Sequence, residues 1–154
     1  MAFNEYDIRL YRSEFFPQVV DLLQYLIGND HDTNRSYFKW KYDDNPYTES
    51  PLGIMALYKG KVVGFRGYFA TRFQIKGKND KIISLCPGDT CVHPDHRRQK
   101  VFTQLYRHIE SLACKRNQVR ALRLYVKEDN AVGQAVYKKL SMSYTGYHVY
   151  EREF

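Results

Sequence analysis

Three long stretches of strand-forming sequence follow one another with only short turns between them. Residues 53–58, 62–73 and 81–92 are rich in apolar, β-branched and aromatic side chains. A Lys-Gly pair separates the first two stretches, and a Gly-Lys-Asn-Asp sequence precedes the third. Because short glycine-containing connections join antiparallel neighbours, the sequence predicts an antiparallel meander at the centre of the fold.

Helical and strand-like segments flank this meander. Residues 7–11 alternate apolar and polar side chains, which predicts a strand. Helical spacing of apolar residues predicts helices over 16–27 and 98–116, and a shorter helix is expected over 34–41. The remaining expected elements are a strand over 119–127, a helix over 130–140 and a last strand over 144–151. This order predicts an α/β (α+β) fold, a mixed and mostly antiparallel sheet flanked by helices, in a single domain over residues 1–154.

The composition argues against several classes of protein. A hydrophobic content of 44% and 14 tyrosines are typical of a folded core and not of a disordered chain. No apolar run approaches the roughly 20 residues that cross a bilayer. Residues 1–7 lack the basic and apolar regions of a signal peptide. We therefore expect a cytoplasmic protein that does not bind a membrane.

The cysteines argue against a disulfide framework and against a metal site. Cys86, Cys91 and Cys114 are odd in number and have no paired spacing, so we expect buried free thiols. Cys91 and His93 would share one face of a strand. However, no second ligand pair occurs at the spacing that zinc sites use, and we predict no metal.

The formal net charge of +7 favours anionic ligands. Coenzyme A, a nucleotide sugar or an acidic protein would all fit this charge. The basic residues are scattered along the chain, with no basic arm and no nucleic-acid-binding motif. A nucleic-acid partner is therefore the least favoured of the anionic partners.

The junction between the strand over 81–92 and the helix over 98–116 carries three cations, Arg97, Arg98 and Lys100. A helix start offers unpaired backbone N–H groups and the positive end of the helix dipole. Together with these cations, it could hold a pyrophosphate. A solvated basic surface is the alternative interpretation.

From this junction onward, the order of motifs resembles the GCN5-related N-acetyltransferase (GNAT) superfamily, whose members transfer an acyl group from acyl-CoA to an amine. The matching features are Val92-His93-Pro94, the run from Arg97 to Phe102, the strand over 121–127, Asn130 and Tyr137. The first half of the chain matches the family by the order of its elements.

The sequence departs from the family pattern at three places. Lys100 stands where the family usually has glycine, and Phe102 stands where it has glycine or alanine. Leu140-Ser141-Met142 replaces a frequent Leu-Gly-Phe. The departures at Lys100 and at Ser141-Met142 motivate an alternative function, a catalytically weak CoA-binding or interaction module with the same fold.

The resemblance implies that acetyl-CoA is the co-substrate. In this family two strands splay apart and the pantetheine arm lies between them, where Cys91 and Val92 would offer backbone groups. The pyrophosphate would lie mainly on backbone N–H groups of the junction, from Arg97, Arg98, Gln99, Lys100, Val101 and Phe102. Asn130 is expected to cap the last helix, and the resemblance adds a contact with the CoA arm.

The resemblance also implies a general acid. Tyr137 follows Asn130 by seven residues, so both lie on one helix face. A tyrosine at this place in the family protonates the departing thiolate, and a phenol suits this task because it stays protonated at neutral pH. A tyrosine of the core is the alternative.

Asp89 is the best candidate for the base that takes the proton of the acceptor amine, because it lies on the fourth strand just before the expected CoA gap. His93 and a water relay are its rivals. An exposed or capping role for Asp89 is the structural alternative.

Arg66 is a charge inside an apolar strand, so it needs a partner or a wet cleft. It could hold a carboxylate or phosphate of the acceptor, or it could point to solvent. Trp40 and Tyr68 are candidates for aromatic walls of the acceptor site, as are Tyr42 and Tyr47. The expected acceptor is a small-molecule or protein amine, with an anionic one favoured, and the protein would be a monomer or a homodimer.

The leading prediction is an acyl-CoA-dependent N-acetyltransferase in which an uncharged primary amine attacks the thioester directly. No covalent enzyme intermediate is needed, so Cys91 is not expected to be a nucleophile.

Overall fold

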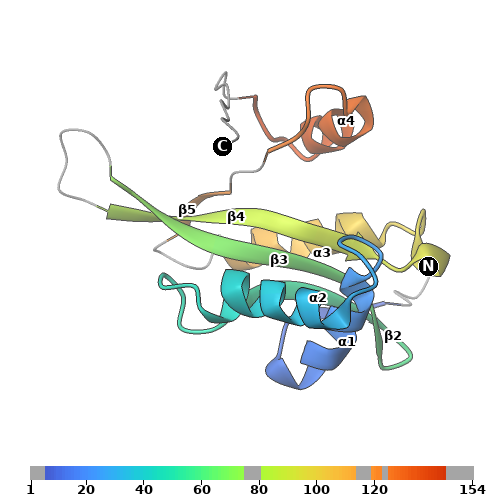
Figure 1. Cartoon of the computed structure of the whole chain (residues 1–154). Helices are drawn as coiled ribbons and strands as arrows, with labels where there is room; N and C mark the ends of the chain where they lie inside the picture. Colours follow the sequence, from blue (N-terminus) through green and yellow to red (C-terminus); the bar gives the residue numbers. More distant parts are fainter. Residues whose placement is uncertain (1–5, 75–80, 114–118, 123–124, 145–154) are drawn as a thin grey trace. The chain divides into compact units, whose positions relative to one another are not determined.

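The computed structural model describes residues 6–74, 81–113, 119–122 and 125–144 (Figure 1). The chain divides into two compact units, Met1–Leu124 and Tyr125–Phe154. The first unit contains the sheet and three α-helices, and the second contains one α-helix.

A five-stranded sheet forms the centre of the first unit, with the strands in sequence order from β1 to β5. Its strands are β1 (Asp7–Leu10), β2 (Leu52–Tyr58), β3 (Lys61–Gln74), β4 (Lys81–Val92) and β5 (Val119–Leu122). The first four strands pair antiparallel, and β5 pairs parallel with β4. The predicted meander and the mixed, mostly antiparallel sheet are therefore confirmed.

The helices agree with the prediction in number and order but differ at their ends. They are α1 (Phe16–Leu23), α2 (His31–Phe38), α3 (Val101–Ala113) and, in the second unit, α4 (Ala131–Lys139). Short 3₁₀ turns cover Ser13–Phe15 and Pro94–His96, and a π-helical turn, η2, covers Lys39–Asp43. Within the described residues, no helix is both long enough and apolar enough to cross a membrane.

Local interactions explain the shifted ends. The helix expected over 34–41 begins earlier, because the Asp30 side chain accepts hydrogen bonds from the amides of Asp32 (3.0 Å) and Thr33 (3.2 Å). Of the strand expected over 119–127, the described part is Val119–Leu122, and residues 125–127 are not in a strand. The strand expected over 144–151 lies almost wholly outside the described residues.

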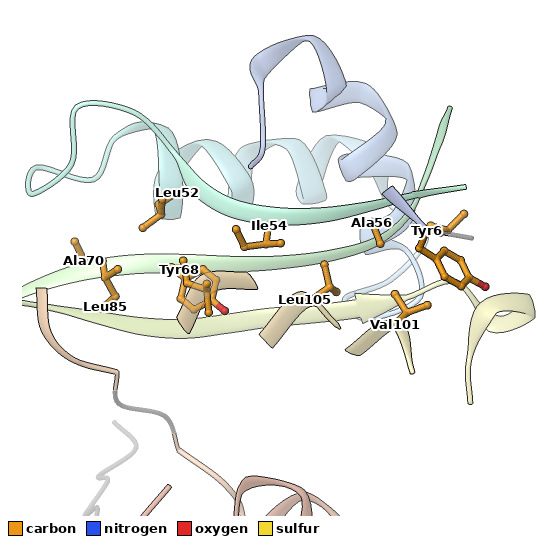
Figure 2. Close-up of a cluster of buried hydrophobic side chains, with 11 residues drawn as sticks. Tyr6, Leu52, Ile54, Ala56, Tyr68, Ala70, Leu85, Val101 and Leu105 are labelled. Atoms are coloured by element: carbon orange, nitrogen blue, oxygen red, sulfur yellow. The ribbon is translucent and has the colours of Figure 1, made fainter. Parts of the chain in front are cut away.

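Helices cover both faces of the sheet. On one face, α3 packs on the strands through a cluster of small and aliphatic side chains with two tyrosines (Figure 2). Its members include Ile54, Ala56, Tyr68, Ala70, Leu85, Val101 and Leu105. On the other face, α1 and α2 pack through a second cluster that includes Val19, Leu23, Phe38, Met55, Phe65 and Cys91. Neighbouring strand residues such as Ile54 and Met55 thus belong to opposite cores, as the period of two requires.

The cysteines that the structure describes are buried free thiols, as predicted. Cys86 and Cys91 are each 4% exposed, and neither forms a disulfide. The Cys91 thiol donates to the carbonyl oxygen of Leu22 in α1 at 3.3 Å. Cys114 lies outside the described residues.

Gly64 in β3 allows α3 to lie close to the sheet. A Cβ atom at this position would lie 2.9 Å from a methyl group of Val101 and 3.3 Å from the Cβ of Ala56. Such contacts are closer than packed side chains tolerate. The absence of a side chain at Gly64 therefore fixes where the start of α3 sits on the strands.

We expect Gly64→Ala to lower the free energy of unfolding by about 1–3 kcal/mol, because the added methyl group overpacks the contact with α3. Urea denaturation measures this change. Val101→Ala removes the nearest methyl group, so the same substitution should cost less in a Val101→Ala background. Equal costs in the two backgrounds would contradict the close approach.

Candidate active site

A β-bulge interrupts the pairing of β3 with β4. Phe65 pairs with Cys91 and Gly67 pairs with Gly88, so two β4 residues, Asp89 and Thr90, lie opposite one β3 residue. Asp89 has a φ of 45°, in the left-handed region that residues other than glycine rarely adopt. This conformation costs about 1–2 kcal/mol and is common at functional sites.

The bulge brings the Asp89 carboxylate to three donors from α2 and η2. Oδ1 accepts from the Tyr37 hydroxyl at 3.0 Å. Oδ2 accepts from the Lys41 ammonium at 3.0 Å and from the Tyr42 hydroxyl at 2.6 Å. The Lys41 ammonium also donates to the Tyr37 hydroxyl at 2.6 Å. These four residues, here named the Asp89 cluster, form a connected polar network beneath the helices.

The π-helical turn and a glycine make this network possible. The amide of Asp44 donates to the carbonyl oxygen of Lys39 (2.9 Å), which closes the wide turn that carries Lys41 and Tyr42. A Cβ atom at Gly67 would overlap the hydroxyl and the ring of Tyr42. Gly67 therefore provides the space in which the Tyr42 hydroxyl reaches Asp89.

The network fixes which groups carry protons at neutral pH. Burial, with the nearby Asp89 charge, raises the pKa of the Tyr37 and Tyr42 phenols. Burial opposes the charge on Lys41, but hydrogen bonds to Tyr37 and Asp89 and the Asp89 charge outweigh it, so the Lys41 pKa is raised. All three neighbours therefore donate to Asp89, and the Tyr37 hydroxyl also accepts from Lys41.

Sequence reasoning selected Asp89 but missed Tyr37 and Lys41 as its partners. The spacing of four residues between them, which places both on one helix face, was the available signal. Trp40, which was expected at the acceptor site, is 69% exposed, and its ring centroid lies 6.0 Å from that of Tyr37. It therefore borders the Asp89 cluster on the solvent side.

Arg66 and Tyr68 lie elsewhere. Both side chains are 1% exposed and face α3. The Arg66 guanidinium donates to the Thr90 hydroxyl at 3.0 Å and lies 5.0 Å from the ring centroid of Phe102 and 5.7 Å from that of Tyr106. In this structure, neither side chain is accessible to an acceptor substrate that arrives from solvent. Arg66 instead supports the bulge from the α3 side.

The strand-to-helix junction combines the start of a helix with three exposed cations. The helical hydrogen bond from the Gln104 amide to the Lys100 carbonyl (3.1 Å) leaves residues 101–103 without helical acceptors for their amides. Arg97, Arg98 and Lys100 are exposed, and none of them pairs with a carboxylate of the described residues. The Arg97 Nε donates to the carbonyl oxygen of Val92 at 3.0 Å, which ties the junction to the end of β4.

Two junction residues also explain why α3 begins later than the predicted position 98. Arg98 has a φ of 62° and Lys100 a φ of 63°, so the chain is left-handed at both. A right-handed α-helix cannot include these left-handed residues, so α3 begins after them, at Val101. Lys100 thus adopts the backbone conformation that glycine would favour at the position where the family has glycine.

The edge of β4 next to β5 is only partly paired. The two strands pair at Ile83 with Val119 and at Leu85 with Leu122. Beyond Leu85, β4 continues to pair with β3 as far as Val92, whereas none of the described residues of this unit pairs with its other edge. The backbone of Cys91 and Val92 lies in this stretch.

The second unit contains the other two predicted site residues. Asn130 caps α4 by accepting from the amide of Gly133 at 2.8 Å, so its predicted capping role is confirmed. Tyr137 lies in the last turn of α4 and is half-buried. Its role as general acid stays a prediction.

His93, the rival base, lies in a different place from the Asp89 cluster. It lines a surface hollow of about 400 Å³ between α1 and the start of β3. Its Nε2 lies 3.2 Å from the Tyr25 hydroxyl. No residue of the Asp89 cluster lines this hollow.

The acetyltransferase (GNAT) family model matches residues 8–142, and the chain belongs to this family. The match begins in β1 and extends past α4, so it includes Asp89, the junction, Asn130 and Tyr137. The protein is therefore an acyl-CoA-dependent N-acetyltransferase by family. No curated protein matches the chain significantly.

Solved structures share the fold at low sequence identity. A possible acetyltransferase from Clostridium difficile 630 has a TM-score of 0.77 at 21% identity, covering 98% of this chain and 99% of its own. The aminoglycoside N-acetyltransferase AAC(6')-Iy in complex with CoA has a TM-score of 0.72 at 17% identity, covering 96% and 94%. A ribosomal-protein-alanine N-acetyltransferase from Brucella melitensis biovar Abortus 2308 has a TM-score of 0.72 at 17% identity, covering 98% and 100%. These likenesses confirm the predicted fold class.

We expect Lys100→Gly to raise the free energy of unfolding by about 1 kcal/mol, because glycine adopts a left-handed conformation without the steric cost of a Cβ atom. Lys100→Ala, which removes the ammonium but keeps the Cβ, is the control and should give no such gain. Urea denaturation of both variants measures the difference. Equal stabilities of the two variants would contradict a strained backbone at Lys100.

Proposed function

We propose that the protein transfers an acetyl group from acetyl-CoA to a primary amine by direct attack on the thioester. The observation that carries this proposal is Asp89, a carboxylate that a bulge presents to α2 and η2, in the stretch of β4 whose second edge pairs with none of the described residues of its unit. Membership of the GNAT family supplies the class of reaction. We further propose that residues 1–154 act as one catalytic domain, because the family match spans both compact units.

Acetyl-CoA would lie along β4 and the junction that follows it. Backbone groups of Cys91 and Val92 at the open strand edge would pair with the amides of the pantetheine arm. The amides and cations from Arg97 to Phe102 would hold the pyrophosphate at the start of α3. Asn130 would add a contact with the CoA arm. The exposed cations and the left-handed backbone of the junction support this placement.

In the proposed reaction, Asp89 receives a proton from the acceptor ammonium, directly or through a water molecule. The uncharged amine attacks the thioester carbonyl, a C–N bond forms and the C–S bond breaks. The departing CoA thiolate takes a proton from the Tyr137 hydroxyl, and the second proton of the amine nitrogen returns to the Tyr137 phenolate, directly or through water, so that the products are the amide and the CoA thiol. Cys91 is unsuited to a covalent intermediate, because burial raises its thiol pKa to about 11 and little thiolate exists at neutral pH.

The acceptor would be an amine of a small molecule or a protein. Two of the structural neighbours are named for aminoglycosides and for ribosomal-protein alanine as acceptors. The expectation of an anionic acceptor rested on Arg66 together with the basic balance of the chain, and Arg66 is buried on the α3 face. The exposed Trp40 beside Tyr37 supports an aromatic wall at the entrance. Buried free thiols at Cys86 and Cys91 support a reducing compartment such as the cytoplasm.

The alternative, a CoA-binding module without turnover, depended on departures from glycine at Lys100 and Ser141. Both residues have left-handed backbones, with φ values of 63° and 61°. At the end of α4, the Ser141 amide donates to the carbonyl oxygen of Lys138, and the Met142 amide donates to the carbonyl oxygen of Tyr137. Helices that end at a glycine have the same hydrogen bonds. The backbone that glycine would favour is thus kept at both positions, which supports an active enzyme.

Thiol release from acetyl-CoA tests the reaction, with a panel that contains a polyamine, an aminoglycoside and an alanine-ended peptide. Asp89→Asn keeps the shape of the side chain but removes the base, so turnover should fall roughly 10²–10⁴-fold. Asp44→Asn, which alters an exposed carboxylate paired with Lys39, is the control. Wild-type protein that releases no thiol with any amine would overturn the proposed reaction.

Tyr137→Phe keeps the ring and removes only the hydroxyl, so it should lower turnover by roughly 10²–10⁴-fold if this hydroxyl protonates the thiolate. Acetyl-CoA affinity should change little, because the lost interaction belongs to the transition state. Calorimetry and steady-state kinetics separate the two effects. Turnover at the wild-type rate would assign Tyr137 to the core.

A further inference from the structure

The Lys41 ammonium lies among aromatic rings as well as beside Asp89. Its Nζ is 5.0 Å from the ring centroid of Tyr37, 5.4 Å from that of Phe69 and 5.7 Å from that of Tyr42. The Asp89 Oδ2 is 3.0 Å away on the same nitrogen. A carboxylate, a phenol hydroxyl and neighbouring aromatic rings around one cation are groups that can together bind an organic ammonium ligand.

The occupant of this arrangement is a side chain of the protein itself. Lys41 comes from the π-helical turn η2, and its side chain is 17% exposed, so the cage reaches the surface along the lysine stem. An acceptor that gives its proton to Asp89 needs the position beside Oδ2 that the Lys41 ammonium fills. The ammonium groups of the acceptor and of Lys41 cannot both occupy this position, because two like charges so close together repel each other.

We infer that the Asp89 carboxylate and the rings of Tyr37, Tyr42 and Phe69 form the binding subsite for the acceptor's ammonium group, and that Lys41 fills it as a tethered competitor until an acceptor displaces it. The inference rests on the proposed function, because it takes Asp89 as the residue that receives the acceptor. The chemical class it specifies is a primary alkylammonium, whose first methylene groups would lie where those of Lys41 lie now.

Two features make the displacement of Lys41 feasible. The lysine side chain is long and flexible, and its charge can be solvated once it leaves the cage. Much of the subsite is also held without it, since Tyr42 lies in the space that Gly67 leaves, the bulge fixes Asp89, and Tyr37 keeps its own hydrogen bond to Asp89 at 3.0 Å after losing the one from Lys41. A vacated cage would therefore keep its shape, with the carboxylate in place.

Lys41→Ala tests the inference by removing the tethered occupant and leaving the cage. The probe is n-butylammonium, with n-butanol as its neutral counterpart, titrated by calorimetry without acetyl-CoA. Fluorescence of Trp40, the single tryptophan of the chain, follows the same titration beside Tyr37. Removal of a competitor that occupies the site more than nine-tenths of the time should tighten n-butylammonium binding at least roughly tenfold.

Lys39→Ala is the matched control, because Lys39 precedes Lys41 by two residues and pairs with the exposed Asp44 at 2.6 Å. It should bind n-butylammonium as the wild type does. If Lys41→Ala is unstable alone, n-butylammonium should raise its melting temperature in a dose-dependent way, whereas n-butanol should not. Binding no tighter than wild type, no such rise, or an equal effect of n-butanol would overturn the inference.

The outcome is separable from that of the proposed reaction. If Lys41→Ala tightens n-butylammonium binding but the wild-type protein releases no thiol with any amine, the inferred subsite stands and the proposed reaction fails. If the wild-type protein acetylates amines but Lys41→Ala does not tighten n-butylammonium binding, the proposed reaction stands and the inferred subsite fails.

Discussion

The bulge at Asp89 and Thr90 determines which way each end of β4 faces. Leu85, before the bulge, packs with α3, whereas Cys91, six residues later, packs with α1. In a regular strand the two side chains would share a face, because side chains alternate with a period of two. The extra residue reverses this alternation. The same reversal presents Asp89 to α2 and Thr90 to Arg66, so the site exists because the strand is irregular.

The parts of the fold that are determined by residues close together in the sequence could be predicted. The short turns predicted the meander, and Asn130 predicted the start of α4. The bulge could not be predicted, because the register of β4 depends on partners along a different strand. The Asp89 cluster was missed for the same reason, since Asp89 and its donors are separated by 47 to 52 residues.

Left-handed residues other than glycine mark the places where the sequence was hardest to interpret. Asp89, Arg98, Lys100 and Ser141 all have positive φ values between 45° and 63°. Each costs about 1–2 kcal/mol, so the surrounding structure must hold it. At Lys100 and Ser141, the side chain suggested a departure from the family pattern, whereas the backbone has the left-handed conformation that glycine favours. The residue type at a position therefore does not by itself determine its backbone conformation.

The positions of the charged residues say more about the acetyl-CoA site and the proposed acceptor site than the net charge of the whole chain does. The value of +7 predicted an anionic partner, and the exposed cations of the junction are where an anionic co-substrate would bind. The proposed acceptor side has the opposite character, because the Asp89 carboxylate would be its central group and the Lys41 ammonium lies 3.0 Å from that carboxylate. Arg66 does not change this, since it is buried on the other face of the sheet. A basic chain can thus select a cationic acceptor, because selectivity depends on the charge that lines each subsite and not on the sum over the surface.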